Sequence, residues 1–224
     1  MSITVLLPEN LYSAPLRALL EPMLPPGSVI RRPEDGMENL ENRRLLFAVA
    51  LDPSGCSLAY YGMLQALRGC DILLRGSVAG VIVTGVGEFY TKDVARDMVF
   101  AANQAGCAFL GRPLVEATGS LANFRIQAKN LGTDLAGAYE AAVADTAQRL
   151  EHEVFALVVS GYSGCDTVAR QVISAMNMNK SFYLPPRFAL MATANDPGEA
   201  MAAPDINQRL DQFAETMRRT LVQE

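Results

Sequence analysis

Short, almost wholly apolar segments alternate with segments whose apolar residues recur every three or four positions along most of this chain. The clearest apolar segments are residues 45–51 and 79–84. A strand that is covered on both faces has this pattern, because every side chain along it is buried. The periodic segments are typical of amphipathic helices that bury one face.

This alternation predicts strands over 3–7, 28–31, 45–51, 79–84, 154–159 and 188–193, with a further, interrupted strand within 107–117. It predicts helices over 11–23, 58–68 and 135–150, and helices that begin near Thr91, after Gly164 and near Asp205. Strands that alternate with helices form βαβ units with parallel strands. The expected fold class is therefore α/β, with three α/β/α layers around a doubly wound, mostly parallel sheet.

The length of 224 residues is enough for one large domain or two small ones. Half of the residues are apolar and 19% are charged, which is typical of a chain that forms a core. We expect a single α/β domain over residues 1–224, with residues 130–153 as the place where an internal junction would lie.

The net charge of -5 argues against a nucleic-acid partner, which would favour a basic face. No stretch reaches the roughly 18 apolar residues that span a bilayer. The first residues also lack the basic start of a secretory signal. We therefore expect a cytoplasmic protein that binds neither nucleic acid nor a membrane.

The four cysteines form no C-x-x-C pair, so we expect no metal site and expect the cysteines to be reduced and mostly buried. The only histidine, His152, lies between two glutamates and is expected on the surface. A nucleophile–histidine mechanism would have to be built around that one residue, which excludes most hydrolase mechanisms.

Loops that follow parallel strands lie at the carboxyl edge of the sheet, where such sheets bind ligands. In the segment SGYSG at 160–164, two glycines free the backbone amides and Tyr162 offers a ring for stacking. Alternatively, Tyr162 only fills the edge of the sheet. The candidate cofactor-binding residues in this loop are Ser160, Gly161, Tyr162, Ser163 and Gly164.

Two other loops are unusual. Thr118, Gly119 and Ser120 offer amide and hydroxyl donors to an anion at the start of a helix, although ordinary serine capping explains the pattern equally well. The loop over 84–92 contains two glycines and several polar residues. Its simpler interpretation is a tight turn followed by a helix that Thr91 caps.

Residues 154–198 read VFALVVSGYSGCDTVARQVISAMNMNKSFYLPPRFALMATANDPG, and this run resembles the C-terminal half of flavodoxin-like NAD(P)H-dependent FMN reductases. The SGYSG and LPPRFAL segments carry the resemblance. It implies a flavodoxin-like fold, FMN as cofactor and NAD(P)H as hydride donor, with residues 160–164 against the isoalloxazine ring. Residues 43–135 resemble an N-terminal module of longer members of the same group.

The chain departs from that family where the FMN phosphate would bind. Such reductases follow their first strand with a serine-rich phosphate loop, whereas here the first strand leads into Pro8, Glu9 and Asn10. Proline lacks an amide donor, and the glutamate would repel a phosphate. Ser13 and the turn at 118–120 are candidate substitutes.

Two hypotheses therefore stay open. The first is an FMN-binding, NAD(P)H-linked oxidoreductase. The second is a non-catalytic flavodoxin-like domain that has lost FMN binding and serves small-molecule binding or oligomerisation. Neither names catalytic residues. Both include a small-molecule ligand. Both also include a homo-oligomer, because a flavodoxin-like domain that lacks half of its sheet would expose apolar surface that a second copy could cover.

Overall fold

The computed structural model describes residues 2–69, 73–85, 90–110, 114–118, 153–154, 157–161, 163–178, 182–193, 199 and 205–221. A five-stranded sheet in the order β2-β1-β3-β4-β6 forms the centre of the N-terminal half. Its strands are β1 (Thr4–Leu6), β2 (Val29–Arg31), β3 (Arg44–Ala50), β4 (Val78–Gly85) and β6 (Leu114–Thr118). Every neighbouring pair in this sheet is parallel.

The edge strand of this sheet is interrupted, as the sequence predicts. Ala108 bridges Val78 in parallel just before β5 (Phe109–Leu110), and β6 then pairs with the second half of β4. An order of 2-1-3-4 completed by one edge strand is the flavodoxin-like arrangement of a doubly wound sheet. The resemblance to FMN reductases lies in residues 154–198, whereas the strands in this order lie within residues 4–118.

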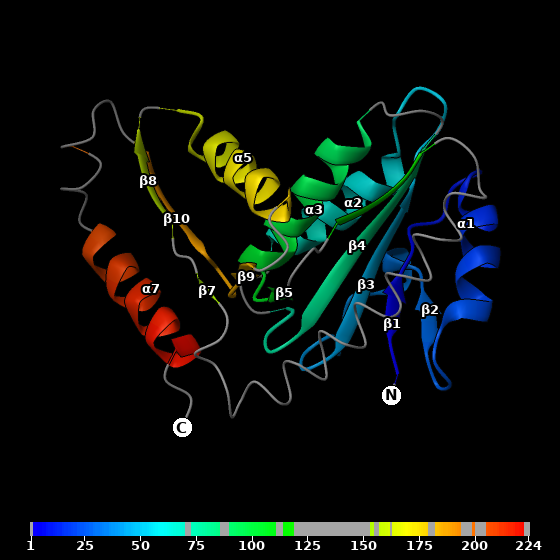
Figure 1. Ribbon diagram of the computed structural model, residues 1–224, viewed down its shortest axis with the longest axis horizontal. Coiled ribbons are helices and arrows are strands. Elements are labelled where there is room, and N and C mark those ends of the chain that lie inside the picture. The colour runs from blue at the N-terminus through cyan, green and yellow to red at the C-terminus, as the bar shows by residue number, and fades with distance from the viewer. Residues whose placement is uncertain are drawn as a thin grey trace.

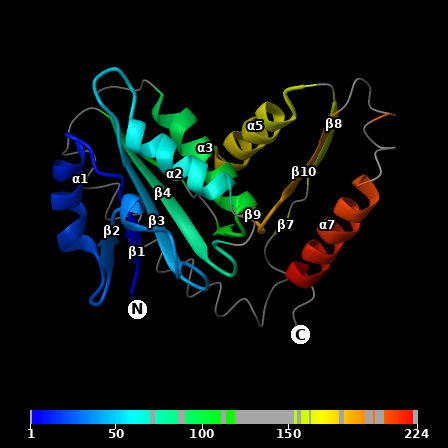
Figure 2. The ribbon, with the colours of Figure 1, turned by 180° about the vertical axis from the view of Figure 1, so that it is seen from behind.

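Helices cover both faces of the sheet (Figures 1 and 2). Helix α1 (Ser13–Leu20), which continues as a 3-10 turn η1 (Glu21–Met23), packs on one face. Helices α2 (Leu58–Arg68) and α3 (Thr91–Gln104) pack on the other. Leu46 packs with Leu16 of α1, and its neighbour Phe47 packs with Met63 of α2 and Met98 of α3. Successive strand residues face opposite sides, which confirms the predicted three layers.

The C-terminal half adds a smaller α/β unit. Strands β8 (Leu157–Gly161) and β10 (Ala189–Thr193) pair in parallel. Helices α5 (Cys165–Met178) and α7 (Ile206–Leu221) lie on opposite sides of this pair (Figures 1 and 2). A third sheet joins β5 to β9 (Phe182–Leu184) and β9 to β7 (Glu153–Val154).

The two halves are joined by buried contacts. Asn103, at the end of α3, donates from Nδ2 to the carbonyls of Pro185 (2.7 Å) and Cys107 (3.2 Å). Its Oδ1 accepts from the backbone N–H of Phe188 at 2.8 Å. Because Asn103 is fully buried, these bonds replace the ones that water would make.

Helix α5 also docks directly on α3. Arg170 pairs with Asp97 of α3 at 2.5 Å and with Asp166 of its own helix. Its guanidinium carbon lies 4.9 Å from the centre of the Phe100 ring. Ala169, one position before Arg170, is fully buried in the same core as Met98. Of the periodic apolar positions after Gly164, Ala169 and Ile173 are confirmed to face inward.

Two predictions about the elements are wrong, one strand was missed, and one predicted helix is not tested. The strand expected over 154–159 is divided, because β7 pairs with β9 whereas β8 pairs with β10. The sequence pattern gave no sign of β9. Thr91 does not cap α3: it is the first helical residue, and Tyr90 occupies the N-cap position without a side-chain cap. The helix expected over 135–150 lies outside the described residues.

Two of the three cysteines that the structure describes, Cys107 and Cys165, are buried, whereas Cys56 is exposed. Burial raises the pKa of the Cys107 thiol well above its ordinary value. No group of three or more potential metal ligands gathers among the described residues. None of the helices in that part of the chain is long and apolar enough to cross a membrane.

Candidate functional site

The direction of winding reverses between two neighbouring strands. From β1 the chain crosses to β2 at one edge, and from β3 it crosses to β4 on the other side. In sheets of this kind ligands bind beyond the carboxyl ends of the strands at this switch point. The candidate site therefore consists of the loop over 7–12 after β1, the loop over 51–57 after β3, and Tyr90 after β4.

Asn10 ties the first two loops together. Its side-chain Nδ2 donates to the carbonyl of Ala50 at 2.7 Å and to the hydroxyl of Ser57 at 3.1 Å. Ser57 in turn caps α2 by accepting from the backbone N–H of Tyr60. One amide side chain thus spans the switch point and connects the end of β3 to the start of α2.

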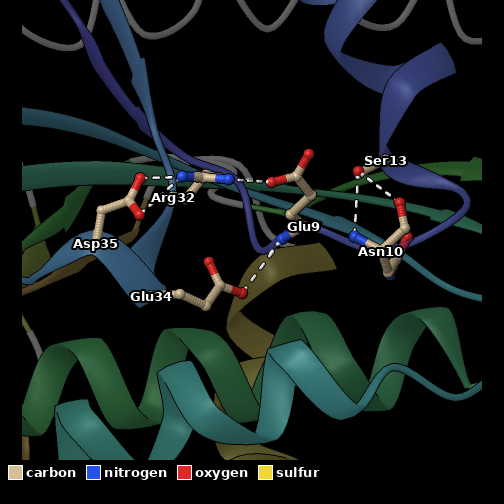
Figure 3. Close-up of polar contacts among 6 residues, drawn as sticks. All are labelled: Glu9, Asn10, Ser13, Arg32, Glu34 and Asp35. Carbon is tan, nitrogen blue, oxygen red and sulfur yellow. Dashed lines mark hydrogen bonds and ion pairs between the residues drawn. The ribbon is translucent and has the colours of Figure 1, made fainter.

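The backbone amides of the loop after β1 are used within the chain (Figure 3). The N–H of Glu9 donates to the carboxylate of Glu34 at 3.2 Å. The N–H of Asn10 donates to the hydroxyl of Ser13 at 3.2 Å. The N–H of Tyr12, which is not drawn, donates to Oδ1 of Asn10 at 2.8 Å. The N–H of Ser13 donates to the carbonyl of Asn10. Ser13, a predicted substitute for the phosphate loop, therefore uses its hydroxyl within the loop, where Oγ accepts from the N–H of Asn10 and donates to the carbonyl of Asn10 at 2.8 Å.

The charges around this loop are mainly negative. Arg32 lies between Glu9, at 2.6 Å, and Asp35, at 2.7 Å (Figure 3). The hydrogen bond from Arg32 lowers the pKa of Asp35, and the same two carboxylates raise the pKa of Arg32. Glu34 adds a third carboxylate on the Glu9 amide, so three carboxylates lie near this loop together with Arg32 and Arg31, and Arg31 also lowers the pKa of Asp35.

The loop after β3 uses its amides in the same way. Oδ1 of Asp52 accepts from the hydroxyl of Ser54 (2.6 Å), the N–H of Ser54 (2.8 Å) and the N–H of Cys56 (2.9 Å). These hydrogen bonds, chiefly that from the Ser54 hydroxyl, lower the pKa of Asp52. An aspartate of the loop itself thus occupies donors that an anion would need.

These contacts decide whether the FMN phosphate fits the switch point. A phosphate dianion needs several convergent backbone donors or a net positive charge. Here most backbone donors of both loops are engaged, and carboxylates lie beside the first loop. The FMN phosphate therefore does not fit the loop after β1, and no chemical step is derived through FMN at this site.

The same edge exposes large apolar and aromatic side chains. In the loop after β1, Leu11 is 92% exposed and Tyr12 is 40% exposed. At the start of α2, Leu58 is 88% exposed and Tyr61 is 56% exposed. Tyr90, at the start of α3, is 58% exposed. These five residues follow β1, β3 and β4, which are adjacent and parallel, and we call them the apolar rim of the carboxyl edge.

Tyr90 has an uncommon backbone conformation. Its φ of 62° lies in the left-handed region, which costs a non-glycine residue about 1–2 kcal/mol. Its carbonyl nevertheless accepts the first hydrogen bond of α3, from the N–H of Val94 at 2.9 Å. Strained residues of this kind concentrate at ligand sites, where the surrounding structure holds them in place.

The residues predicted from the sequence lie in different sheets. Thr118 ends β6 and pairs with Gly85 of the five-stranded sheet. Ser160 and Gly161 end β8, where they pair with Ala192 and Thr193 of β10. Ser163 and Gly164 follow as exposed residues before α5. Tyr162, Gly119 and Ser120 lie outside the described residues, and the binding role of the whole set stays a prediction.

Sequence reasoning missed the residues that shape the switch point. Asn10 and Glu34 form hydrogen bonds with residues that lie 40 and 25 positions away in the sequence, and no local pattern predicts such contacts. The turn at Asp52 could have been predicted, because an aspartate followed two positions later by serine is typical of an Asx turn. Tyr61 lies outside the apolar stripe of α2, so its exposed ring could also have been predicted.

Comparisons with known proteins support no family assignment. No protein-family model and no curated protein matches the chain. Among solved structures, the oxidised flavodoxin 2 from Bacillus cereus is similar, with a TM-score of 0.46, 10% identity, and coverage of 62% of this chain and 99% of that one. A short-chain flavodoxin associated with a bacterial microcompartment gives a TM-score of 0.43, 15% identity, and coverage of 62% and 98%. The flavodoxin-like strand order follows from the strand pairing itself.

Proposed function

We propose that this protein is a flavodoxin-like binding domain whose ligand is a planar, uncharged aromatic ring system, with riboflavin as the first compound to test. The observation that carries the proposal is the apolar rim: exposed tyrosines follow three adjacent parallel strands at the switch point. Aromatic rings that stack on a planar ligand gain about 0.5–1.5 kcal/mol beyond the area they bury.

We propose an uncharged ligand because carboxylates lie beside the loop after β1. Glu34 accepts from the N–H of Glu9 in the loop where a phosphate would bind, and Arg32 beside it is already paired with Glu9 and Asp35. A phosphate would replace carboxylate hydrogen bonds and meet like charges. Riboflavin has the isoalloxazine ring of FMN without its phosphate, so it keeps the stacking surface and avoids the repulsion.

The test is a titration of riboflavin with the protein, followed by the quenching of flavin fluorescence that stacking on tyrosine produces. We expect saturable quenching by the wild-type protein. Tyr90→Ala and Tyr61→Ala should each weaken binding by about tenfold, because a stacked ring contributes roughly 1.4 kcal/mol.

The control variant is Val168→Ala, which removes an exposed apolar side chain from α5, away from the rim. It should bind riboflavin as the wild type does. Absence of saturable quenching by the wild-type protein, or equal loss in Val168→Ala and Tyr90→Ala, would contradict the proposal.

A second candidate function is the FMN-binding oxidoreductase with NAD(P)H as donor. It is favoured by the unit β8–α5–β10, in which β8 and β10 are parallel, Gly161 ends β8 and Gly164 precedes the helix α5. Under this candidate FMN binds at residues 160–164. The same titration distinguishes the two, because FMN binding would then be lost in Tyr162→Ala and kept in Tyr90→Ala.

A further inference from the structure

Asp35 and Gly36 form the only Asp-Gly pair in the chain, and the sequence contains no Asn-Gly pair. The pair follows β2, at the end of the 3-10 turn η2 (Pro33–Asp35). An aspartate side chain can form a cyclic imide with the next backbone nitrogen, and it does so most readily before glycine, which has no Cβ beside that nitrogen. This turn therefore contains the aspartyl bond of the chain that is chemically most prone to isomerise.

The backbone of the turn requires the glycine. Gly36 has a φ of 122° and a ψ of 148°, a conformation that residues with a Cβ rarely adopt. The N–H of Gly36 donates to the carbonyl of Pro33 at 3.1 Å and closes the turn. The nitrogen that would attack the Asp35 side chain is thus unshielded by a side chain of its own residue, but its N–H is hydrogen-bonded.

Arg32 holds the other reacting group (Figure 3). Its Nε donates to Oδ2 of Asp35 at 2.7 Å, and its Nη2 donates to Oδ1 at 2.9 Å. Nη1 of the same guanidinium donates to the carboxylate of Glu9 at 2.6 Å, so the arginine is also held from its other side. Both oxygens of Asp35 are therefore bound to one planar group, and the side chain cannot change its rotamer without breaking two hydrogen bonds.

The charge of Asp35 acts in the same direction. The hydrogen bond from Arg32 lowers the pKa of Asp35, with a smaller contribution from the charge of Arg31. The imide forms from the neutral carboxyl group, which can lose its hydroxyl as water, whereas the ionised carboxylate cannot. Arg32 thus restrains Asp35 both in position and in protonation state.

We propose that Asp35 is a site of isoaspartate formation and that Arg32 controls the rate of this modification. The nitrogen of Gly36 attacks Cγ of Asp35, an N–Cγ bond forms, and the carboxyl hydroxyl leaves with the amide proton as water. A second water then opens the five-membered ring. Addition at Cγ restores aspartate, whereas addition at the backbone carbonyl of Asp35 breaks its bond to the Gly36 nitrogen. In that product the main chain runs through Cγ and is one methylene longer, and no oxidant or cofactor is consumed.

The modification acts on an arginine that also contacts the switch point. Isoaspartate carries its free carboxylate directly on Cα, which shifts this group relative to Arg32 and disturbs the two hydrogen bonds between them. The same arginine pairs with Glu9 of the loop after β1. The inference does not depend on the proposed ligand, because it rests on the chemistry of Asp35 and Gly36 alone.

The test follows the uptake of 18O by the whole protein in water enriched in this isotope. Each cycle of ring closure and opening adds one 18O to Asp35, within the peptide over 32–43 that trypsin releases by cleavage after Arg31 and Arg43. Mass spectrometry measures the label, and chromatography separates the aspartate and isoaspartate forms. We expect slow uptake by the wild type and uptake that is about threefold faster or more in Arg32→Gln, together with more isoaspartate.

The variants separate this role from a loss of folding. Arg32 and Asp35 are 47% and 57% exposed, and an ion pair of this kind contributes little to stability, so Arg32→Gln should keep the circular dichroism spectrum of the wild type. Arg218→Gln removes the arginine of another exposed pair with the same i,i+3 spacing, on α7, and should leave the uptake at residues 32–43 unchanged.

The variant Asp35→Glu tests the assignment to Asp35. A glutamate at this position would have to form a six-membered ring, which closes far more slowly, so this variant should take up no label at residues 32–43. The proposal is overturned by equal uptake in the wild type and Arg32→Gln, by the absence of label in Arg32→Gln, or by an equal acceleration in Arg218→Gln. Uptake in Asp35→Glu as fast as in Arg32→Gln would place the reaction at another residue.

Discussion

The backbone N–H of Glu9 donates a hydrogen bond of 3.2 Å to the carboxylate of Glu34, 25 residues further along the chain. This contact places a negative group of the protein on the loop after β1, where a flavodoxin-like sheet would hold a phosphate. The backbone N–H of Glu9 is thus already hydrogen-bonded within the protein, and a ligand that binds at this edge must do so without a phosphate in that position.

Removing these negative groups should change the selectivity between flavins. In the double variant Glu9→Gln, Glu34→Gln, the loop keeps its shape but loses two charges that repel a phosphate. We therefore expect the affinity for FMN to rise relative to that for riboflavin, as measured by fluorescence titration. Glu21→Gln, at an exposed acidic residue after α1, should leave the ratio unchanged. An unchanged ratio in the double variant would mean that the two carboxylates do not set the selectivity.

Substitution of Tyr90 should separate stability from binding. Asparagine tolerates the left-handed backbone conformation better than tyrosine, so Tyr90→Asn should raise the free energy of unfolding by about 0.5–1 kcal/mol. The same variant should lose most riboflavin quenching, because the exposed ring is gone. Urea denaturation and flavin titration measure the two effects. A variant that is both less stable and fully competent in binding would refute this account of Tyr90.

Asn103 should be the polar residue on which the junction of the two halves depends most. Asn103→Ala leaves the buried N–H of Phe188 and the carbonyl of Pro185 without their partner. The expected loss is at least about 2 kcal/mol in the free energy of unfolding, from urea denaturation. The backbone N–H of Phe188 should also exchange hydrogen faster. Gln171→Ala, at an exposed polar residue of α5, should change stability little, and a similar loss in both variants would argue against the role of Asn103.

The contact of Asp166 with Arg170 should make the docking of α5 sensitive to acid. The hydrogen bond from Arg170 lowers the pKa of Asp166 in the folded protein below its unfolded value. Its contribution is therefore fully present above about pH 4 and is lost as the pH falls through the folded pKa. Thermal melts from pH 6 to pH 3 should show a smaller decrease for Asp166→Asn than for the wild type. Asp211→Asn, at an exposed carboxylate of α7, should follow the wild type; an identical decrease in all three proteins would exclude this contribution.

The sequence predicted most of the central layers because burial leaves a local pattern. The apolar run that ends at Leu51 matches β3, and the bounds of α2 agree with the predicted 58–68. Pairing between distant segments leaves no such pattern. The division of residues 153–161 between two sheets depends on whether β9 or β10 lies beside each part, and neither neighbour is specified within the segment.

The candidate site was less predictable for the same reason. Pro8 and Glu9 already argued against a phosphate loop, and the structure adds the carboxylate of Glu34 and the bridge from Asn10 to the end of β3. Those contacts depend on β1, β2 and β3 lying side by side, which requires the sheet order. The left-handed conformation of Tyr90 is likewise uncommon for a non-glycine residue, so the residue type gives no sign of it.

The most direct measurement of the central claim is the ratio of the dissociation constants of FMN and riboflavin for the wild-type protein at low ionic strength. Because the two ligands differ only in the phosphate, the ratio reports on the loop after β1. We predict that riboflavin binds at least about tenfold more tightly, which corresponds to about 1.4 kcal/mol. FMN binding that is equal to or tighter than riboflavin binding would contradict the account.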